Sequence, residues 1–292
     1  MIIYTDKNID EQSGGWILKK LMIILAAAGL LYGCCRIVIS QDTAEKSQEI
    51  TVSEGGDWML TDDYDSRDSS FEDFLKQKDA YDTLKETYEM LNNAFGGDYY
   101  DVGRQDIEYL GKFPGDEAYV SGGKDAMNQK INGQILSPLE SLQVSYNFVC
   151  QKKMNELIGT GEMFGKEDYQ RGAEQIIPVL AGASYQKMFK AGDTFQGKYL
   201  GEKDLKFQIR GFFKKDAGIS LDNEEILLDR MLVFPSLSLK ENDSGEFQKI
   251  LLSVKCQGYL HYDGKSDLEK KLKQLEKIKK ETGFRYTIPK IR

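Results

Sequence analysis

Histidine and cysteine, the residues that most often build metal and redox sites, are scarce in this chain. His261 is the single histidine among 292 residues, the four cysteines form no CxxC pair, and no HExxH motif occurs. Zinc sites need three or four ligands at regular spacings, most of them Cys or His. We therefore expect no metal centre, and we interpret His261, which lies among strand-like residues, as structural.

Basic residues are outnumbered, and cofactor motifs are missing. The net charge is −8, whereas nucleic-acid-binding proteins gather Lys and Arg to neutralise phosphates. The glycines of residues 159–165 are spaced too widely for a dinucleotide loop, residues 121–124 lack the rest of a phosphate-binding loop, and no G-x-S-x-G motif occurs. We expect no nucleic-acid partner, no cofactor and no enzymatic activity.

The longest uncharged stretch lies near the N-terminus. Residues 21–35 carry no charge, and flanking apolar residues extend the segment to 17–39. A helix of about 20 residues crosses the roughly 30 Å hydrocarbon core of a bilayer, so we predict a single transmembrane helix at 17–39. Lys19 and Lys20 lie at its N-terminal end. By the positive-inside rule, residues 1–16 are cytoplasmic and residues 40–292 form an extracytoplasmic domain anchored to the cell membrane.

A cleaved lipoprotein signal is the alternative for the same segment. Leu31-Tyr32-Gly33-Cys34 approximates a lipobox, in which Cys34 would be lipidated. Tyr32 fits that motif poorly, and the apolar run continues past Cys34, where a lipoprotein usually begins a polar tether. Both interpretations place the main domain outside the membrane.

Two amphipathic helices are expected in this domain. Apolar residues at spacings of three and four predict a helix over 71–91, with Ser70 as its N-cap and a stop at Gly96. The same spacing predicts a helix over 268–278 that ends at Gly283.

Alternating apolar and polar residues predict strands between these helices. Residues 142–148 alternate as in a half-buried strand, and residues 193–200 and 205–213 predict a hairpin across the turn at 201–204. Further extended segments are expected at 49–53, 99–109, 117–120 and 284–288.

The order of these elements predicts an α+β fold. A split βαβ-type unit is expected from residues 40–140 and 236–292, and a β-rich subdomain, 141–235, is inserted between its halves. Cys150 and Cys256 are the candidates for a disulfide in the domain, and two separate buried thiols are the alternative.

Motifs within residues 142–235 resemble a known family of membrane proteins. The predicted strand at its start is followed by Gly161, Phe164 and Asp168 in a G-x-x-F-x-x-x-D pattern. Further along come Pro178 and Gly182 in the segment Ile-Pro-Val-Leu-Ala-Gly, and then Gly192 and Asp193 in a Gly-Asp-Thr entry to the hairpin. Their order resembles the extracytoplasmic, MacB-like core domain of FtsX-like, MacB-type ABC transporter permeases, especially those of Gram-positive bacteria.

The resemblance implies a function in transport. It implies a porter-like α/β part with a β-rich insertion, a non-enzymatic role, and partners that include the membrane, an ABC ATPase and a full-length permease. No later segment is apolar for long enough to span a bilayer, so we expect this chain to lack the later membrane helices of such permeases. The substrate is not identified by these motifs. A surface lipoprotein or anchored binding module unrelated to transport is the alternative.

Overall fold

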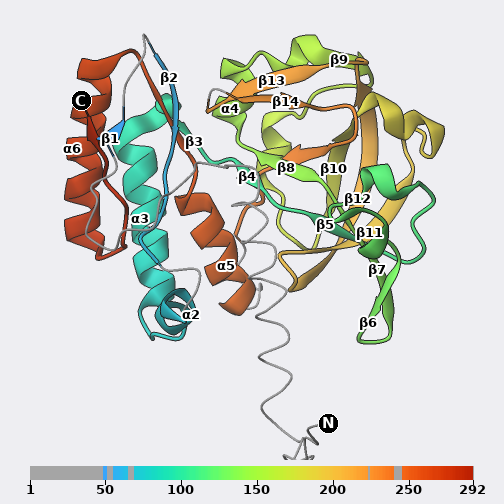
Figure 1. Cartoon of the computed structure of the whole chain (residues 1–292), viewed down its shortest axis with the longest axis horizontal. Coiled ribbons are helices and arrows are strands. Elements are labelled where there is room, and N and C mark those ends of the chain that lie inside the picture. Colours follow the sequence, from blue (N-terminus) through green and yellow to red (C-terminus); the bar gives the residue numbers. More distant parts are fainter. Residues whose placement is uncertain (1–48, 51–54, 65–68, 223, 240–244, 292) are drawn as a thin grey trace, which may run out of the picture. The chain divides into compact units, whose positions relative to one another are not determined.

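The computed structural model describes residues 49–50, 55–64, 69–222, 224–239 and 245–291, which form an α+β domain (Figure 1). The predicted cytoplasmic segment 1–16, the predicted transmembrane helix 17–39 and Cys34 lie outside these residues. Within the described ranges, no helix combines the length and the apolar character needed to cross a membrane.

A small antiparallel sheet is formed by strands from both ends of the domain. Its order is β2 (Gly56–Met59), β16 (Tyr259–Tyr262), β3 (Tyr99–Tyr100), and β16 runs antiparallel to both neighbours. The helices α2 (Ser70–Leu75) and α3 (Ala80–Phe95) connect β2 to β3. Therefore β2 and β3 run parallel, and a strand from the far end of the chain lies between them.

Helices cover this small sheet. Helix α3 packs against α5 (Gly245–Cys256) and α6 (Lys265–Thr282). The shared core contains Leu84, Leu252 and Leu275, all fully buried. A second pair of strands, β1 (Glu49–Ile50) and β17 (Lys290–Ile291), is parallel and joins the two ends of the domain.

The residues between β3 and α5 form a much larger sheet, which is curled in Figure 1. The strand order is β4-β8-β15-β10-β12-β11-β5-β7-β6, and β9 pairs with β12. Strands β13 and β14 form a separate hairpin. The bounds are β4 Gly103–Arg104, β5 Ile107–Leu110, β6 Gln129–Ile131, β7 Gln134–Leu139, β8 Ser141–Val144, β9 Ile158–Thr160, β10 Ile176–Ala181, β11 Thr194–Tyr199, β12 Lys203–Phe213, β13 Gly218–Leu221, β14 Glu224–Leu227 and β15 Leu232–Pro235.

Strand β12 shows why the sheet forms where it does. Leu205, Phe207 and Ile209 are buried, and the residues between them are exposed, because successive side chains of a strand point to opposite faces. The predicted hairpin is confirmed, since β11 and β12 pair antiparallel with Tyr199 opposite Lys203. The predicted C-terminal helix is also confirmed: α6 ends at Thr282, and Gly283, which has a left-handed φ of +75°, is its C-cap.

The predicted strand at 142–148 is wrong beyond Val144. Strand β8 ends there, and the hydroxyl of Ser145 accepts a hydrogen bond from the backbone N–H of Phe148 at 3.4 Å. This N-cap starts a short helix, α4 (Tyr146–Gln151). Phe148 is buried as expected, but from a helix.

Other boundaries also differ from the sequence expectation. The single helix predicted over 71–91 is two helices, because α2 ends at Leu75 and α3 begins at Ala80. Of residues 117–120, which are expected to be extended, Glu117–Tyr119 form a 3₁₀ turn, with the Asp116 side chain accepting from the N–H of Ala118 at 2.9 Å, and Val120 is extended and bridges to Leu139. Helix α5 was not expected at all.

The large sheet begins earlier in the chain than the expected β-rich segment 141–235. Strand β5 pairs with β11, and β7 pairs with β5. Residues 107–139, which the sequence pattern places in the α/β part, therefore contribute their strands to the large sheet.

Candidate functional site at the junction of the two sheets

Asp168 is the most tightly held of the motif residues. Its side chain is 0 % exposed and pairs with two arginines: Arg171 Nε lies 2.9 Å from Oδ1, and Arg210 Nη2 lies 3.1 Å from the same oxygen, while Arg210 Nη1 pairs with Oδ2. The backbone N–H of Gly165 donates to Oδ2 at 2.8 Å. Asp168 therefore fastens the loop before β10 to strand β12.

These donors determine the charge state of Asp168. Burial by itself would raise the pKa of the carboxyl, but the hydrogen bonds from Arg210, Gly165 and Arg171 outweigh it, and the pKa is lowered. The residue is an ionised anchor whose four acceptor positions are taken up by the protein.

Gly161 permits close contact between the same loop and β12. It has a φ of +84°, and a Cβ at this position would overlap the carbonyl oxygen of Arg210. Phe164 is buried next to Tyr169, with ring centroids 6.3 Å apart. Gly161, Phe164 and Asp168 thus come together and shape one loop.

The remaining motif residues lie at other turns and edges. Pro178 is buried in β10 at a point where β15 does not pair with it, so its missing N–H costs no ladder bond on that side. Gly182 packs against the backbone of Leu228, and Gly192, with a φ of +95°, leads into β11. The Asp193 side chain accepts from the N–H of Lys190 at 2.8 Å.

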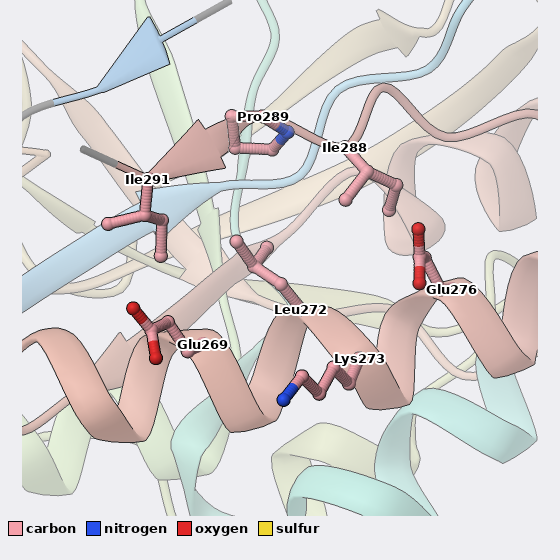
Figure 2. A pocket seen from close by; sticks show the side chains of 7 residues that line it. All are labelled: Glu269, Leu272, Lys273, Glu276, Ile288, Pro289 and Ile291. Atoms are coloured by element: carbon pink, nitrogen blue, oxygen red, sulfur yellow. The ribbon is translucent and has the colours of Figure 1, made fainter. Parts of the chain in front are cut away.

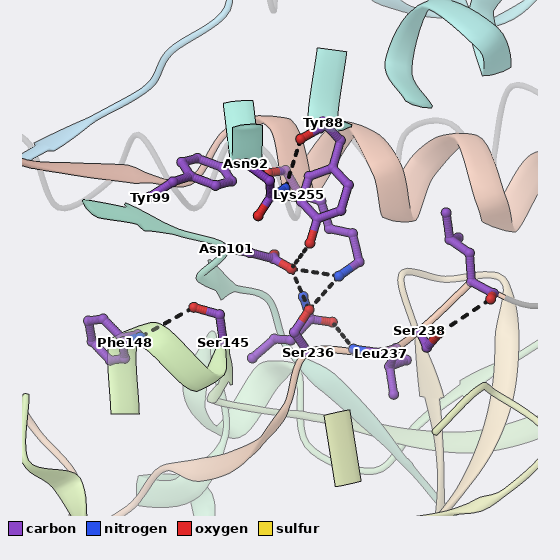
Figure 3. Close-up of polar contacts among 12 residues, drawn as sticks. Tyr88, Asn92, Tyr99, Asp101, Ser145, Phe148, Ser236, Leu237, Ser238 and Lys255 are labelled. Carbon is purple, nitrogen blue, oxygen red and sulfur yellow. Dashed lines mark hydrogen bonds and ion pairs between the residues drawn. The ribbon is translucent and has the colours of Figure 1, made fainter. Parts of the chain in front are cut away.

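A buried polar cluster that the sequence reasoning missed lies where the chain passes between the two sheets (Figure 3). Asp101 Oδ2 accepts hydrogen bonds from Lys255 Nζ at 2.6 Å, from the Tyr88 hydroxyl at 3.1 Å, and from the Ser236 hydroxyl. Lys255 also donates to Ser236 Oγ. Asp101 follows β3, where the chain leaves the small sheet for the large one, and Ser236 follows β15, where it returns. Lys255 of α5 therefore contacts both segments that connect the two sheets.

The cluster has the residue types of a serine–lysine nucleophile but not its surroundings. Lys255 is paired with a carboxylate, and the side chains of Lys255 and Asp101 are only 5 % and 4 % exposed. A substrate has no access to Ser236, which is itself buried. Asp101 Oδ1 and Gln143 Nε2 have no hydrogen-bond partner in the cluster. The arrangement is suited to fixing the two segments that connect the sheets.

A second ion pair links the two sheets. Lys152, at the end of α4, pairs with Asp57 of β2. His261 Nδ1 lies 3.0 Å from Asp57 Oδ1. The single histidine thus supports an ion pair between elements of the small sheet and α4, in agreement with its expected structural role.

The candidate disulfide is wrong. Cys150 and Cys256 are both free thiols; Cys150 is exposed on α4 and Cys256 is buried. Burial raises the pKa of the Cys256 thiol, and its Sγ lies 3.4 Å from the carbonyl oxygen of Leu84. The alternative of two separate thiols is correct, although one of them is not buried.

Two surface hollows accompany these buried clusters. One, of about 450 Å³, is lined by charged, aromatic and apolar side chains that include Glu140, Asp229, Arg230 and Leu227. Leu227 on its rim is 61 % exposed, and the Arg230 guanidinium lies 5.8 Å from the centroid of the Tyr119 ring.

The other hollow, of about 360 Å³, lies between α6 and the C-terminal segment. In Figure 2, Leu272 points from the helix toward Ile288 and Ile291, and Glu269 and Glu276 stand on either side of it.

Metal ligation finds no support in the part of the chain that the structure describes, where no three His, Cys, Asp or Glu side chains are grouped to hold an ion. The buried cluster was not predicted because its members are far apart in the chain and each has an ordinary sequence context. A lysine on the apolar face of α5 was the one available signal.

Comparison with models of protein families, with curated proteins and with solved structures finds no match for this chain.

Proposed function

We propose that this chain is a membrane-anchored, non-enzymatic component of an ABC transporter system, whose domain engages a substrate or a partner outside the membrane. The observation that carries the proposal is the position of the large sheet, which lies between β3 and α5 of the unit built from β2, β3 and β16. The sequence resemblance implies this order, a split, porter-like βαβ unit interrupted by a β-rich insertion.

The motif residues support a non-enzymatic role. Asp168 is fully engaged by arginines, and the glycines serve turns and close backbone contacts. None of them presents a free nucleophile or base at a surface hollow. They organise the inserted sheet, which leaves contact with a substrate or partner to its surface.

The hollow beside Leu227 offers such a surface. Its lining combines an exposed apolar side chain with Arg230, Asp229 and Glu140. Apolar contact surrounded by polar groups is typical of protein and ligand binding sites.

Photo-crosslinking in native membranes tests the proposal. A photoreactive amino acid replaces Leu227 in the tagged full chain, and a matched control carries it at Ile135, a second exposed apolar residue on β7. Capture of an ABC permease from position 227 but not from 135, together with co-purification of its ATPase, is the expected result.

Two outcomes contradict the proposal. Recovery of a lone monomer without permease or ATPase removes the transport role. Incorporation of palmitate into the wild type but not into Cys34→Ala establishes the lipoprotein alternative.

A further inference from the structure

The charge of the chain is divided very unevenly. Residues 265–292 contain ten Lys and Arg against four Asp and Glu, whereas the chain as a whole contains 39 against 47. A segment with an excess of positive charge thus ends a protein that is otherwise strongly acidic. Helix α6 carries seven of these ten basic residues, together with all four acids.

Four exposed lysines follow one line along α6. Lys270, Lys273, Lys277 and Lys280 are separated by three, four and three residues, which places them on one face over about 15 Å of helix. Of the neighbouring acids, Glu281 pairs with Lys277 at 3.7 Å. The other exposed acids, Glu269 and Glu276, line the hollow beside the row (Figure 2). Lys273 of the row also lines this hollow, between the two acids in sequence. Because the hollow presents two carboxylates, an anion would bind along the exposed side of the lysine row and not in the hollow.

The first described strand of the domain, β1, lies close to α6. Strand β1 begins at Glu49 and pairs with β17, whose Ile291 lines the hollow together with α6. Nine residues lie between Glu49 and the end of the predicted membrane segment at residue 39, and the ten Cα-to-Cα steps of that stretch span at most about 35 Å. The lysine row therefore lies on a helix next to the β1–β17 pair, where the described domain begins after the predicted membrane segment.

We propose that the lysine row of α6 binds the anionic lipid headgroups of the membrane to which the chain is anchored. The inference rests on the proposed function, because it uses the predicted membrane segment as the tether. Lysines close to an anionic leaflet are attracted to it, and salt screens the attraction. The contact orients the acidic remainder of the domain away from the membrane.

Lysine labelling on the full chain tests this contact. The protein is reconstituted into vesicles of phosphatidylcholine, alone or mixed with phosphatidylglycerol, and treated with a membrane-impermeant amine reagent. We expect labelling of the four lysines to fall about fivefold in the anionic vesicles and to recover in about 0.5 M salt. Lys130, exposed on β6, is labelled equally in both vesicles.

A double variant supplies the matched control. Lys273→Glu with Lys277→Glu leaves Lys270 and Lys280 in place, and their labelling is expected to become independent of phosphatidylglycerol. Equal labelling of the wild type in both vesicles overturns the proposal. Protection by a soluble polyphosphate but not by the anionic vesicles also overturns it.

The anchor is tested separately. Extraction of the chain by alkaline carbonate shows that residues 17–39 do not span, which contradicts the proposed function. In that case the lysine row is tested by itself: co-sedimentation of the extracted chain with anionic vesicles, lost in the double variant, supports binding by the row. Absence of co-sedimentation contradicts it.

Discussion

Single side chains in this protein connect segments that are distant in sequence. Asp168 and Arg210 are 42 residues apart, and their ion pair fixes a loop of otherwise irregular backbone to the longest strand of the large sheet. A charge of this kind has to be matched, because an unpaired buried charge is far less stable in a protein interior than in water. The effect of removing it is therefore measurable.

Replacing Asp168 with Asn should lower the free energy of unfolding by about 2–3 kcal/mol, since Arg210 and Arg171 lose their carboxylate but remain partly hydrated. The lowered pKa of Asp168 implies that the pair stabilises the fold above pH about 4, the ordinary carboxyl value, and that this contribution is lost as the pH falls toward the folded pKa. Urea unfolding at pH 7 and pH 3 measures both effects.

Asp204→Asn is the control for this prediction. Asp204 pairs with Lys198 at the exposed end of the hairpin, and its loss should change the stability by less than about 1 kcal/mol. Equal effects of the two variants at pH 7 would show that Asp168 is not an anchor.

The two described thiols should differ sharply in reactivity. Cys150 is exposed, whereas Cys256 is buried with a raised pKa. In the folded protein, iodoacetamide at pH 8 should alkylate Cys150, and Cys256 should react only in urea. Peptide mass spectrometry resolves the two sites, and a recovered peptide pair joined by a disulfide would contradict the structure.

At the scale of elements, the pattern of apolar residues determines some segments more strongly than others. Strand β12 and helix α6 are long, and their periods of two and of three to four were both recognised. In α5, Phe247, Leu251 and Val254 have helical spacing, yet the sequence analysis predicts no helix there. Val144 and Phe148 fit a strand and also the spacing of one helical turn, and the Ser145 cap decides for the helix.

Some residues of the candidate site can be predicted from the sequence and others cannot. The turn glycines and Asp168 could be named because local motifs contain them, but their role as anchors depends on Arg210, which no local pattern supplies. The cluster of Asp101, Ser236 and Lys255 depends entirely on tertiary contacts. Sequence periodicity carries no information about such pairings.

The hairpin of β13 and β14 offers a test of local electrostatics. Burial, followed by the charges of Glu224 and Asp57, raises the pKa of Asp222 to about 6. The folded state therefore holds this proton more tightly than the unfolded chain, and stability falls as the pH rises from about 4 to about 6. Asp222→Asn removes that loss and keeps a residue that tolerates the φ of +51°.

We expect Asp222→Asn to raise the free energy of unfolding at pH 7.5 by less than about 1 kcal/mol, and to have almost no effect at pH 4. Asp216→Asn is the matched control, because Asp216 has a φ of +58° and a side chain that is 76 % exposed. It should leave stability unchanged at both pH values. A loss of stability in Asp222→Asn at pH 7.5 would contradict the assignment.

At the scale of the whole molecule, the buried cluster around Asp101 and one further ion pair connect the small sheet with the part of the chain that carries the large one. Asp101, Ser236 and Lys255 lie at both connecting segments, and Lys152 and Asp57 form a second link. The stability of the domain as one unit should therefore depend on Lys255 more than on any exposed lysine.

Lys255→Met should lower the free energy of unfolding by about 3–5 kcal/mol, because Asp101 is left buried without a cation. The double variant Asp101→Asn with Lys255→Met should recover part of this loss, since no charge is then buried. Lys273→Met, on the exposed face of α6, is the control and should change stability by less than about 0.5 kcal/mol. Urea unfolding followed by circular dichroism measures all three, and a Lys255→Met effect as small as that of Lys273→Met would contradict the role of the cluster.

The hydrogen bond between Ser236 and Asp101 has a consequence for how the domain can be taken apart. It joins the residues that flank the inserted sheet, Asp101 before β4 and Ser236 after β15, so the chain enters and leaves the insertion at neighbouring points. A short linker that joins residue 101 to residue 236 would bypass the insertion and leave the helical unit as a continuous chain. The excised sheet would have neighbouring ends, so it could be inserted into a loop of another protein. The large sheet is thus a separable insertion within the helical unit.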